Sequence, residues 1–155
     1  MMGGDYPSGH EFNFWGDNPL HTGQVVNNWP GRVTFSGYSM GLNVTSGGRL
    51  MRDGPSSDPV RSAYHWYTYD VPRSSWDPLT VLYAMHGRGE VFEFANDFGH
   101  NHVHANGSNT WIFDADRTDQ NWLRLKMGQE AAGDLIDELF LEGASYGWKD
   151  SKREL

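Results

Sequence analysis

The sequence contains no cysteine among its 155 residues. Disulfide bonds, thiolate metal sites and cysteine nucleophiles are therefore excluded. A chain of this length buries enough apolar surface to fold without such cross-links. The absence of cysteine does not indicate a cellular compartment, because exported and cytosolic proteins alike are found without it.

Long apolar runs are also missing, since no stretch approaches the roughly 20 residues that a membrane-spanning helix needs. Residues 1–10 contain glycine, proline and serine, but neither the basic nor the apolar segment of a secretory signal. The sequence thus favours a soluble protein, and a cytoplasmic one by default.

Basic residues are few, with 12 lysines and arginines against 20 acidic residues and a formal net charge of −8. A protein that follows a nucleic acid backbone, or docks on an anionic membrane, needs its cations clustered on one face. Here they are scattered among the acids. The sequence therefore disfavours both kinds of partner.

Aromatic residues, at 14%, and glycine, with 19 residues, are abundant. Glycine and proline recur at intervals of roughly eight to twelve residues, a spacing typical of antiparallel sandwiches and barrels. Between them lie segments in which apolar and polar residues alternate with period two. We therefore predict an all-β fold, an antiparallel barrel or a two-sheet sandwich of about 8–10 short strands.

The strongest predicted strand covers 61–70, which is rich in aromatic and β-favouring residues. The nearly continuous apolar segment 79–86 predicts a central strand that is buried on both faces. Segments 110–115 and 121–127 are expected to form the last hairpin. Further strands are predicted over 32–38 and 90–95.

One helix is predicted, over 129–142. Its apolar residues recur at helical spacing, at Ala132, Leu135, Ile136, Leu139 and Phe140. Its opposite face carries acidic residues, among them Asp137, and no basic one. Gly143 predicts the end of this helix, followed by a polar tail over 144–155. We expect residues 1–155 to form a single β-rich domain that this helix covers.

Three histidines alternate with other residues in the segment 100–104. In an extended chain, side chains two positions apart lie on the same side, roughly 6.5–7 Å from each other. Neutral imidazole is a good ligand for divalent transition metals. His100, His102 and His104, with His86 as a fourth, are therefore candidate metal ligands. The alternative is that they are loop histidines that bind nothing.

Seven tryptophans are more than the core of one domain of this size accommodates. Trp29, Trp76 and Trp148 lie in turn or tail contexts beside polar residues, glycine or proline. Exposed tryptophan in such surroundings is typical of sugar-binding and protein-binding surfaces. Trp29, Trp66, Trp76 and Tyr64 are therefore candidate ligand-binding residues. The alternative is that these rings cap the ends of a barrel.

Short functional motifs are nearly absent. The chain has no phosphate-binding loop, no nucleophile elbow, no zinc-protease helix motif and no dinucleotide fingerprint, so no catalytic residue is predicted. Two tripeptides, Asn43-Val44-Thr45 and Asn106-Gly107-Ser108, match the N-glycosylation sequon. Such tripeptides also arise by chance, and they mean little without export.

Three functions remain open. The first is a non-catalytic binding domain that uses an aromatic-rich β scaffold to bind a carbohydrate or a small apolar ligand. The second is a structural subunit that assembles with copies of itself into a particle or filament. The third is an enzyme that depends on His100, His102 and His104, with or without a divalent transition metal as cofactor. The surplus of aromatic residues and the missing motifs favour the first.

Overall fold

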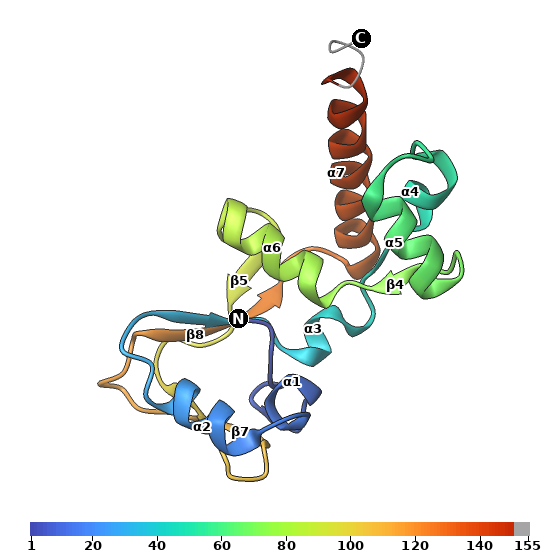
Figure 1. Ribbon diagram of the computed structural model, residues 1–155. Coiled ribbons are helices and arrows are strands. Elements are labelled where there is room, and N and C mark those ends of the chain that lie inside the picture. The colour runs from blue at the N-terminus through green and yellow to red at the C-terminus, as the bar shows by residue number, and fades with distance from the viewer. Residues whose placement is uncertain (151–155) are drawn as a thin grey trace. The chain divides into compact units, whose positions relative to one another are not determined.

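The computed structural model describes residues 1–150, and it describes side chains through residue 146. The chain forms two compact units, whose elements are labelled in Figure 1. Unit 1 consists of Met1–Leu42 and Trp76–Met127, and unit 2 consists of Asn43–Ser75 and the chain from Gly128 onward. Each unit is therefore built from segments that lie far apart in the sequence.

Unit 1 contains two small sheets, neither of which closes on itself. In the first, β7 (Asn109–Ile112) lies between β1 (Ser8–Gly9) and β6 (His100–Val103), and both neighbours are antiparallel to it. In the second, β8 (Gln120–Leu125) lies between β2 (Val33–Phe35), which is parallel to it, and β5 (Phe92–Phe94), which is antiparallel.

Four helices belong to unit 1: α1 (Phe12–Trp15), α2 (Pro19–Asn27), α3 (Tyr38–Leu42) and α6 (Trp76–His86). The start of α2 follows local rules, because the Asn18 side chain accepts a hydrogen bond from the His21 N–H and a proline occupies the first turn. A cluster of buried hydrophobic side chains in this unit comprises Phe14, Val26, Val33, Phe35, Val103 and Trp111.

The outer edge of β6 is covered by side-chain amides. The Asn27 amide donates to the Val103 carbonyl at 2.9 Å and accepts from the Val103 N–H at 2.8 Å. The Asn101 N–H donates to the Gln120 Oε1 atom at 2.9 Å. These contacts replace those of a neighbouring strand, so this edge is closed to strand addition.

Asn109, which is 1% exposed, ties β7 to the N-terminal segment and to β6. Its amide nitrogen donates to the Asp5 carbonyl at 2.8 Å and to Asn101 Oδ1 at 3.0 Å, and its oxygen accepts from the Asp5 N–H at 3.0 Å. We expect Asn109→Leu to lower the free energy of unfolding by roughly 2–4 kcal/mol, because it leaves buried polar partners without a bond. Urea denaturation measures this change, and an unchanged midpoint would contradict the structural role.

Unit 2 contains the antiparallel pair β3 (Thr45–Ser46) and β4 (Arg73–Ser74), together with α4 (Gly48–Asp53), α5 (Pro59–Thr68) and α7 (Gln129–Asp150). Helix α7 packs on both β3 and α4. It begins where the sequence predicts a helix, but it continues past Gly143 through Asp150.

Asp137, which the sequence places on the helix face opposite the apolar stripe, joins α7 to α4. It is 6% exposed, and its two carboxylate oxygens accept hydrogen bonds from the Gly47 N–H at 2.7 Å and the Arg49 N–H at 3.1 Å. Gly47 caps α4 without any side-chain oxygen of its own. The carboxylate from α7 therefore supplies the cap that α4 lacks, at the end where a helix favours negative charge.

The predicted all-β fold, whether barrel or sandwich, is wrong. The described residues form a mixed α/β arrangement of seven helices and eight short strands, without a closed barrel. The strongest predicted strand, 61–70, lies mostly in helix α5, and the predicted central strand, 79–86, lies in helix α6. The expected hairpin of 110–115 and 121–127 is absent as well, since β7 and β8 belong to different sheets.

Local signals at the start of α5 outweigh the β propensity of its aromatic residues. The Asp58 side chain accepts from the Arg61 N–H at 2.7 Å, and Pro59 occupies the first turn. In α6 the buried residues, Leu79 and Leu82, are three positions apart, so one helix face is buried. Aromatic and β-branched content is a weak guide where caps and tertiary packing decide otherwise.

Among the described residues, no helix combines the length and the apolar character that crossing a membrane requires.

Candidate functional site

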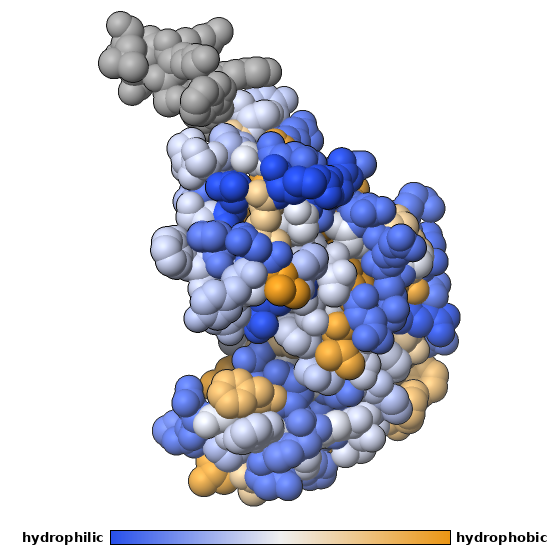
Figure 2. Space-filling view, turned by 90° about the vertical axis from the view of Figure 1, so that its right-hand side faces the viewer, coloured by the Kyte–Doolittle hydropathy of each residue, from blue (hydrophilic) through white to orange (hydrophobic). Residues whose placement is uncertain are grey.

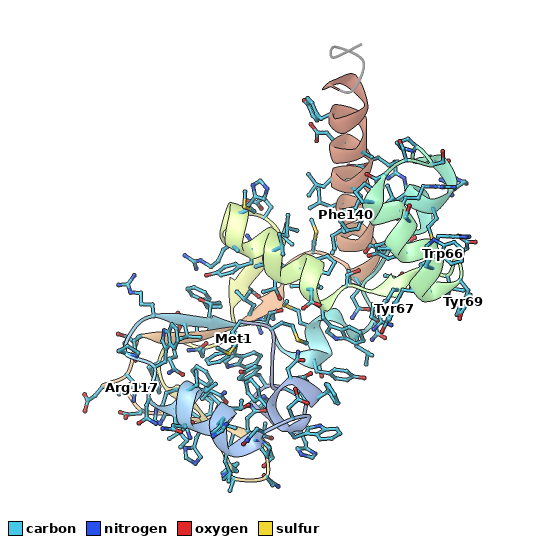
Figure 3. All side chains as sticks on the ribbon, in the orientation of Figure 1. Met1, Trp66, Tyr67, Tyr69, Arg117 and Phe140 are labelled. Atoms are coloured by element: carbon cyan, nitrogen blue, oxygen red, sulfur yellow. The ribbon has the colours of Figure 1, made fainter. Side chains whose placement is uncertain are left out.

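Three large aromatic side chains are exposed at the C-terminal end of α5. The exposed fractions are 76% for Trp66, 68% for Tyr67 and 83% for Tyr69. Figure 3 shows the three labelled side chains gathered around this end of the helix. We call these three residues the aromatic turn. A group of exposed rings is a candidate binding surface, because a ligand that covers the rings removes apolar surface from water, which is favourable.

The backbone of the aromatic turn is strained. Tyr69 has φ 53° and ψ 50°, and Asp70 has φ 64°, so two successive residues other than glycine lie in the left-handed region. That region costs an ordinary residue roughly 1–2 kcal/mol. Strain of this kind persists where the surrounding structure holds it, and it is concentrated at functional sites.

Contacts between α5 and the residues that follow hold the strained backbone. The Tyr69 N–H donates to the His65 carbonyl at 3.1 Å, and the Val71 N–H donates to the Thr68 carbonyl at 3.3 Å. The His65 ring nitrogen Nδ1 lies 2.8 Å from the Asp70 carboxylate. The side chain of Tyr69 is therefore carried on a closed, hydrogen-bonded turn.

Tyr64 anchors the same helix from its inner side. Its hydroxyl lies 3.0 Å from the Ser46 hydroxyl, and its ring meets the edge of Phe140 with 5.9 Å between ring centroids. Burial is the main reason that its pKa is raised. A side chain on Gly47 would overlap the Tyr64 ring, so this close packing requires glycine there. Tyr64 is a packing residue of unit 2.

Polar groups lie beside the exposed rings. The Arg73 guanidinium carbon lies 4.7 Å from the centroid of the Tyr67 ring, over its face. The ring of His65 lies edge-on to Trp66, with 5.0 Å between centroids. Arg73 occupies one face of Tyr67, so the most exposed rings of the aromatic turn are those of Trp66 and Tyr69.

The four predicted ligand-binding residues are divided between the two units. Tyr64 and Trp66 belong to unit 2, whereas Trp29 and Trp76 belong to unit 1. Trp76 packs inside unit 1, with its indole N–H donating to the Tyr38 carbonyl at 2.8 Å and its ring stacked on Tyr38. Trp29 follows α2 and is 47% exposed. The side chain of Trp148 lies outside the described residues.

The predicted histidine metal site is wrong. Among residues 1–150, as far as their side chains are described, no group of three or more histidines or carboxylates is arranged to hold a metal ion. The structure does bring His102 and His104 together, with 4.9 Å between their ring centroids. His104 follows the end of β6 at Val103, and its Nε2 lies 3.1 Å from the Thr110 hydroxyl. His86 lies at the end of helix α6 rather than on a strand beside His100 and His102.

The pKa of His100, which lies in unit 1, links the stability of the fold to pH. Burial, followed by the positive charge of Arg117, lowers its pKa below the ordinary value of 6.5, while Asp114 and Asp119 act in the opposite direction and His102 adds to the lowering. The folded protein therefore resists protonation at His100 more than the unfolded chain does. This contribution to stability is complete above pH 6.5 and decreases as the pH falls from there to the lowered pKa.

We expect His100→Gln to reduce the loss of stability on acidification in this range. The measurement is the urea midpoint of both proteins between about pH 7.5 and about pH 5, above the range in which carboxylates titrate. Parallel pH profiles for the two proteins would contradict the assignment.

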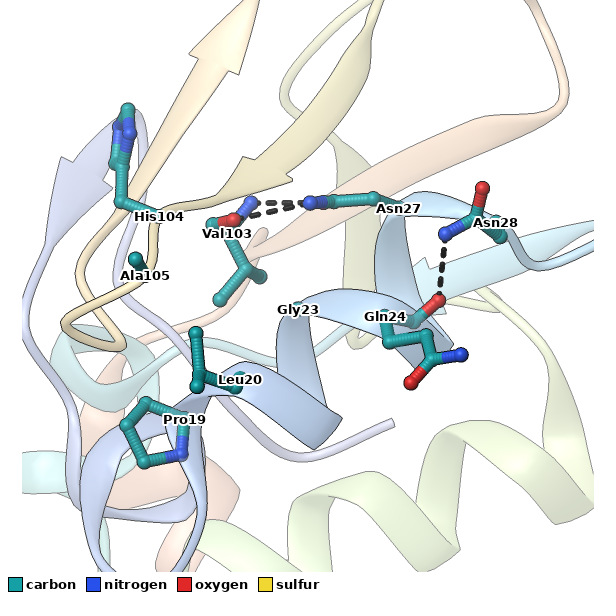
Figure 4. A pocket seen from close by; sticks show the side chains of 9 residues that line it. All are labelled: Pro19, Leu20, Gly23, Gln24, Asn27, Asn28, Val103, His104 and Ala105. Carbon is teal, nitrogen blue, oxygen red and sulfur yellow. Dashed lines mark hydrogen bonds between the residues drawn. The ribbon is translucent and has the colours of Figure 1, made fainter.

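A shallow hollow of about 310 Å³ lies between α2 and β6 (Figure 4). Its lining includes Leu20, Gln24, Asn28 and His104. The Asn28 amide nitrogen donates to the Gln24 carbonyl at 2.8 Å, while the amide of Asn27 is engaged with β6. The volume is at the lower limit for small-molecule sites, roughly 300–1,000 Å³. We therefore prefer the aromatic turn as the candidate site.

Comparison of the chain with protein-family models, with curated proteins and with solved structures found no match.

Sequence reasoning named Trp66 but missed Tyr67 and Tyr69. Both lie in 61–70, which the sequence predicts to be a strand. A strand would place Tyr67 and Tyr69 on one face of a sheet and Trp66 on the other, so the three rings would not form one surface. The Asp58-Pro59 pair is the signal that identifies the segment as a helix, because it combines an N-cap residue with proline in the first turn. The left-handed turn after the helix has no comparable signal, since neither Tyr69 nor Asp70 is a glycine.

Proposed function

We propose that this protein is a non-catalytic binding domain whose aromatic turn stacks against the sugar rings of a carbohydrate. The observation that carries the proposal is the exposure of Trp66 and Tyr69 on a backbone that is held in a strained conformation. Single exposed rings such as that of Trp29 are common on protein surfaces, whereas a group of three exposed rings at one turn is a candidate binding surface. A left-handed turn that served only to reverse the chain would use glycine.

The chemistry of the surface fits a sugar. One face of a pyranose ring carries C–H groups and is apolar, while its edge carries hydroxyl groups that both donate and accept hydrogen bonds. An aromatic ring covers the apolar face, and neighbouring polar side chains bind the hydroxyls. Here the rings are flanked by His65, Asp70 and Arg73, which supply acceptors and donors at the edge of the aromatic turn.

The pattern of surface hydropathy favours a small ligand over self-assembly into a particle or filament. Figure 2 shows the side on which α5 lies in Figure 1, and its hydrophobic residues appear as separate spots among hydrophilic ones. Stable interfaces between copies of one chain commonly bury roughly 2,000 Å² or more of total surface, and that surface is more apolar than separate spots of this kind. A ligand inside a barrel is not part of the proposal, since no barrel is present.

A glycan array tests the proposal. We expect the protein to bind a defined group of glycans, and we expect Trp66→Ala to weaken binding at least ten-fold, equivalent to about 1.4 kcal/mol. Trp29→Ala is the matched control, because it removes an exposed tryptophan from unit 1. It is expected to bind like the parent protein. An array without signal, or equal losses in the two variants, would refute the carbohydrate-binding surface.

A further inference from the structure

Asn106 lies at the tip of the connection between β6 and β7, where it is exposed to solvent. Its side-chain oxygen accepts two hydrogen bonds from Ser108, one from the N–H at 3.1 Å and one from the hydroxyl at 2.7 Å. Both bonds use Oδ1. Within the described part of the chain, the amide nitrogen Nδ2 makes no hydrogen bond and remains available.

The two groups that define the sequon are therefore adjacent on one side of the turn. The Ser108 hydroxyl is hydrogen-bonded to the Asn106 amide, so both groups are accessible together to an enzyme that recognises asparagine and serine at this spacing. Gly107 between them has φ +82°, and a side chain there would overlap Trp15. The turn therefore packs against α1 at Gly107, while the neighbouring Asn106 stays exposed.

The other sequon has a different environment. The side chains of Asn43 and Thr45 are exposed, as that of Asn106 is, but the backbone between them is fixed. Val44 is 0% exposed, and its carbonyl accepts a hydrogen bond from the Ser75 N–H at 2.8 Å. Thr45 belongs to β3 and pairs with Ser74 of β4. The backbone around Asn43 is thus part of the packed structure of unit 2, whereas Asn106 lies on a surface turn of the kind that modifying enzymes reach.

We propose that Asn106 is an acceptor for an N-linked glycan and that Asn43 is not. In the reaction, Asn106 Nδ2 bonds to the anomeric carbon of an oligosaccharide carried on a lipid diphosphate. The bond from that carbon to the diphosphate oxygen breaks, its electron pair leaves with the lipid diphosphate, and Nδ2 releases one proton. The modified form arises where the chain enters a secretory compartment that holds this donor.

The test is cell-free translation of the full chain, fused to a cleavable secretory signal, in the presence of microsomes. Signal cleavage reports entry into the microsomes, and a mobility shift that a peptide N-glycanase reverses reports the glycan. We expect one glycan on the parent chain and on Asn43→Gln, and none on Asn106→Gln or Ser108→Ala. Ser108→Thr, which keeps the hydroxyl, is expected to retain the glycan.

Three results would overturn the proposal: a cleaved parent chain without a glycan, a glycan that persists in Asn106→Gln, or one that is lost in Asn43→Gln. Peptide mapping of the cleaved product by mass assigns the modified residue directly. The thermal unfolding of unmodified Asn106→Gln is measured alongside, and we expect it to match that of the parent protein because Asn106 is exposed.

Discussion

Replacing Gly133 by alanine is expected to lower the free energy of unfolding by about 3 kcal/mol. Gly133 is buried in α7, and a Cβ atom there would overlap the carbonyl group of Thr45 in β3. A backbone group cannot move away as a flexible side chain would. β3 is further held by its pairing with β4, and the next residues are held by the hydrogen bond from the Gly47 N–H to Asp137. Urea denaturation measures the loss.

Gly143, in the same helix, is the matched control for this prediction. A Cβ atom added there meets nothing within 4 Å, and the residue is exposed. Gly143→Ala is therefore expected to stabilise the protein by about 0.5–1 kcal/mol, since alanine has the higher helix propensity. Opposite signs for the two substitutions would establish the contact between α7 and β3. Equal effects would show that this contact is absent.

Replacing Tyr69 by glycine is expected to separate binding from stability. Glycine adopts the left-handed conformation without a steric penalty, so the strain of roughly 1–2 kcal/mol at this position is relieved. The aromatic ring is lost at the same time. We expect the free energy of unfolding to rise by about 1 kcal/mol, while affinity for carbohydrate falls at least ten-fold.

Tyr69→Ala is the control that distinguishes strain from contact. It removes the same ring but leaves a Cβ atom in the left-handed region, so affinity falls without the gain in stability. Urea denaturation and titration with the carbohydrate, applied to both variants, give the comparison. If glycine and alanine proved equally stable, Tyr69 would not be strained. If glycine retained full affinity, the ring would not be part of the binding surface.

The parts of the fold that the sequence predicts are those determined by local patterns. The helical stripe that includes Ala132 and Ile136 indicates the start of α7 and a buried face, and both residues are buried. The short strands β2 and β5 lie within predicted strand segments. The segment that forms α5 was misassigned because its aromatic residues favour strands, while its capping signal precedes the segment at Asp58.

The remaining features depend on contacts between distant residues. Strand β8 pairs with β2, which lies far away in the sequence, so the expected hairpin with β7 does not form. The burial of Asp137 follows from the uncapped N-terminus of α4, which no pattern within α7 reveals. The aromatic turn is only half predictable, since Trp66 is conspicuous in the sequence but the left-handed backbone at Tyr69 is not.

The most direct test of the carbohydrate-binding surface follows the indole N–H signals of the seven tryptophans by NMR. The protein is titrated with the carbohydrate that binds best on the array, and Trp66→Ala assigns the Trp66 signal by its disappearance. Stacking at the aromatic turn predicts that the Trp66 signal shifts with saturation, whereas the Trp29 signal stays in place. A Trp66 signal that stays unchanged while the carbohydrate binds would contradict the proposed surface.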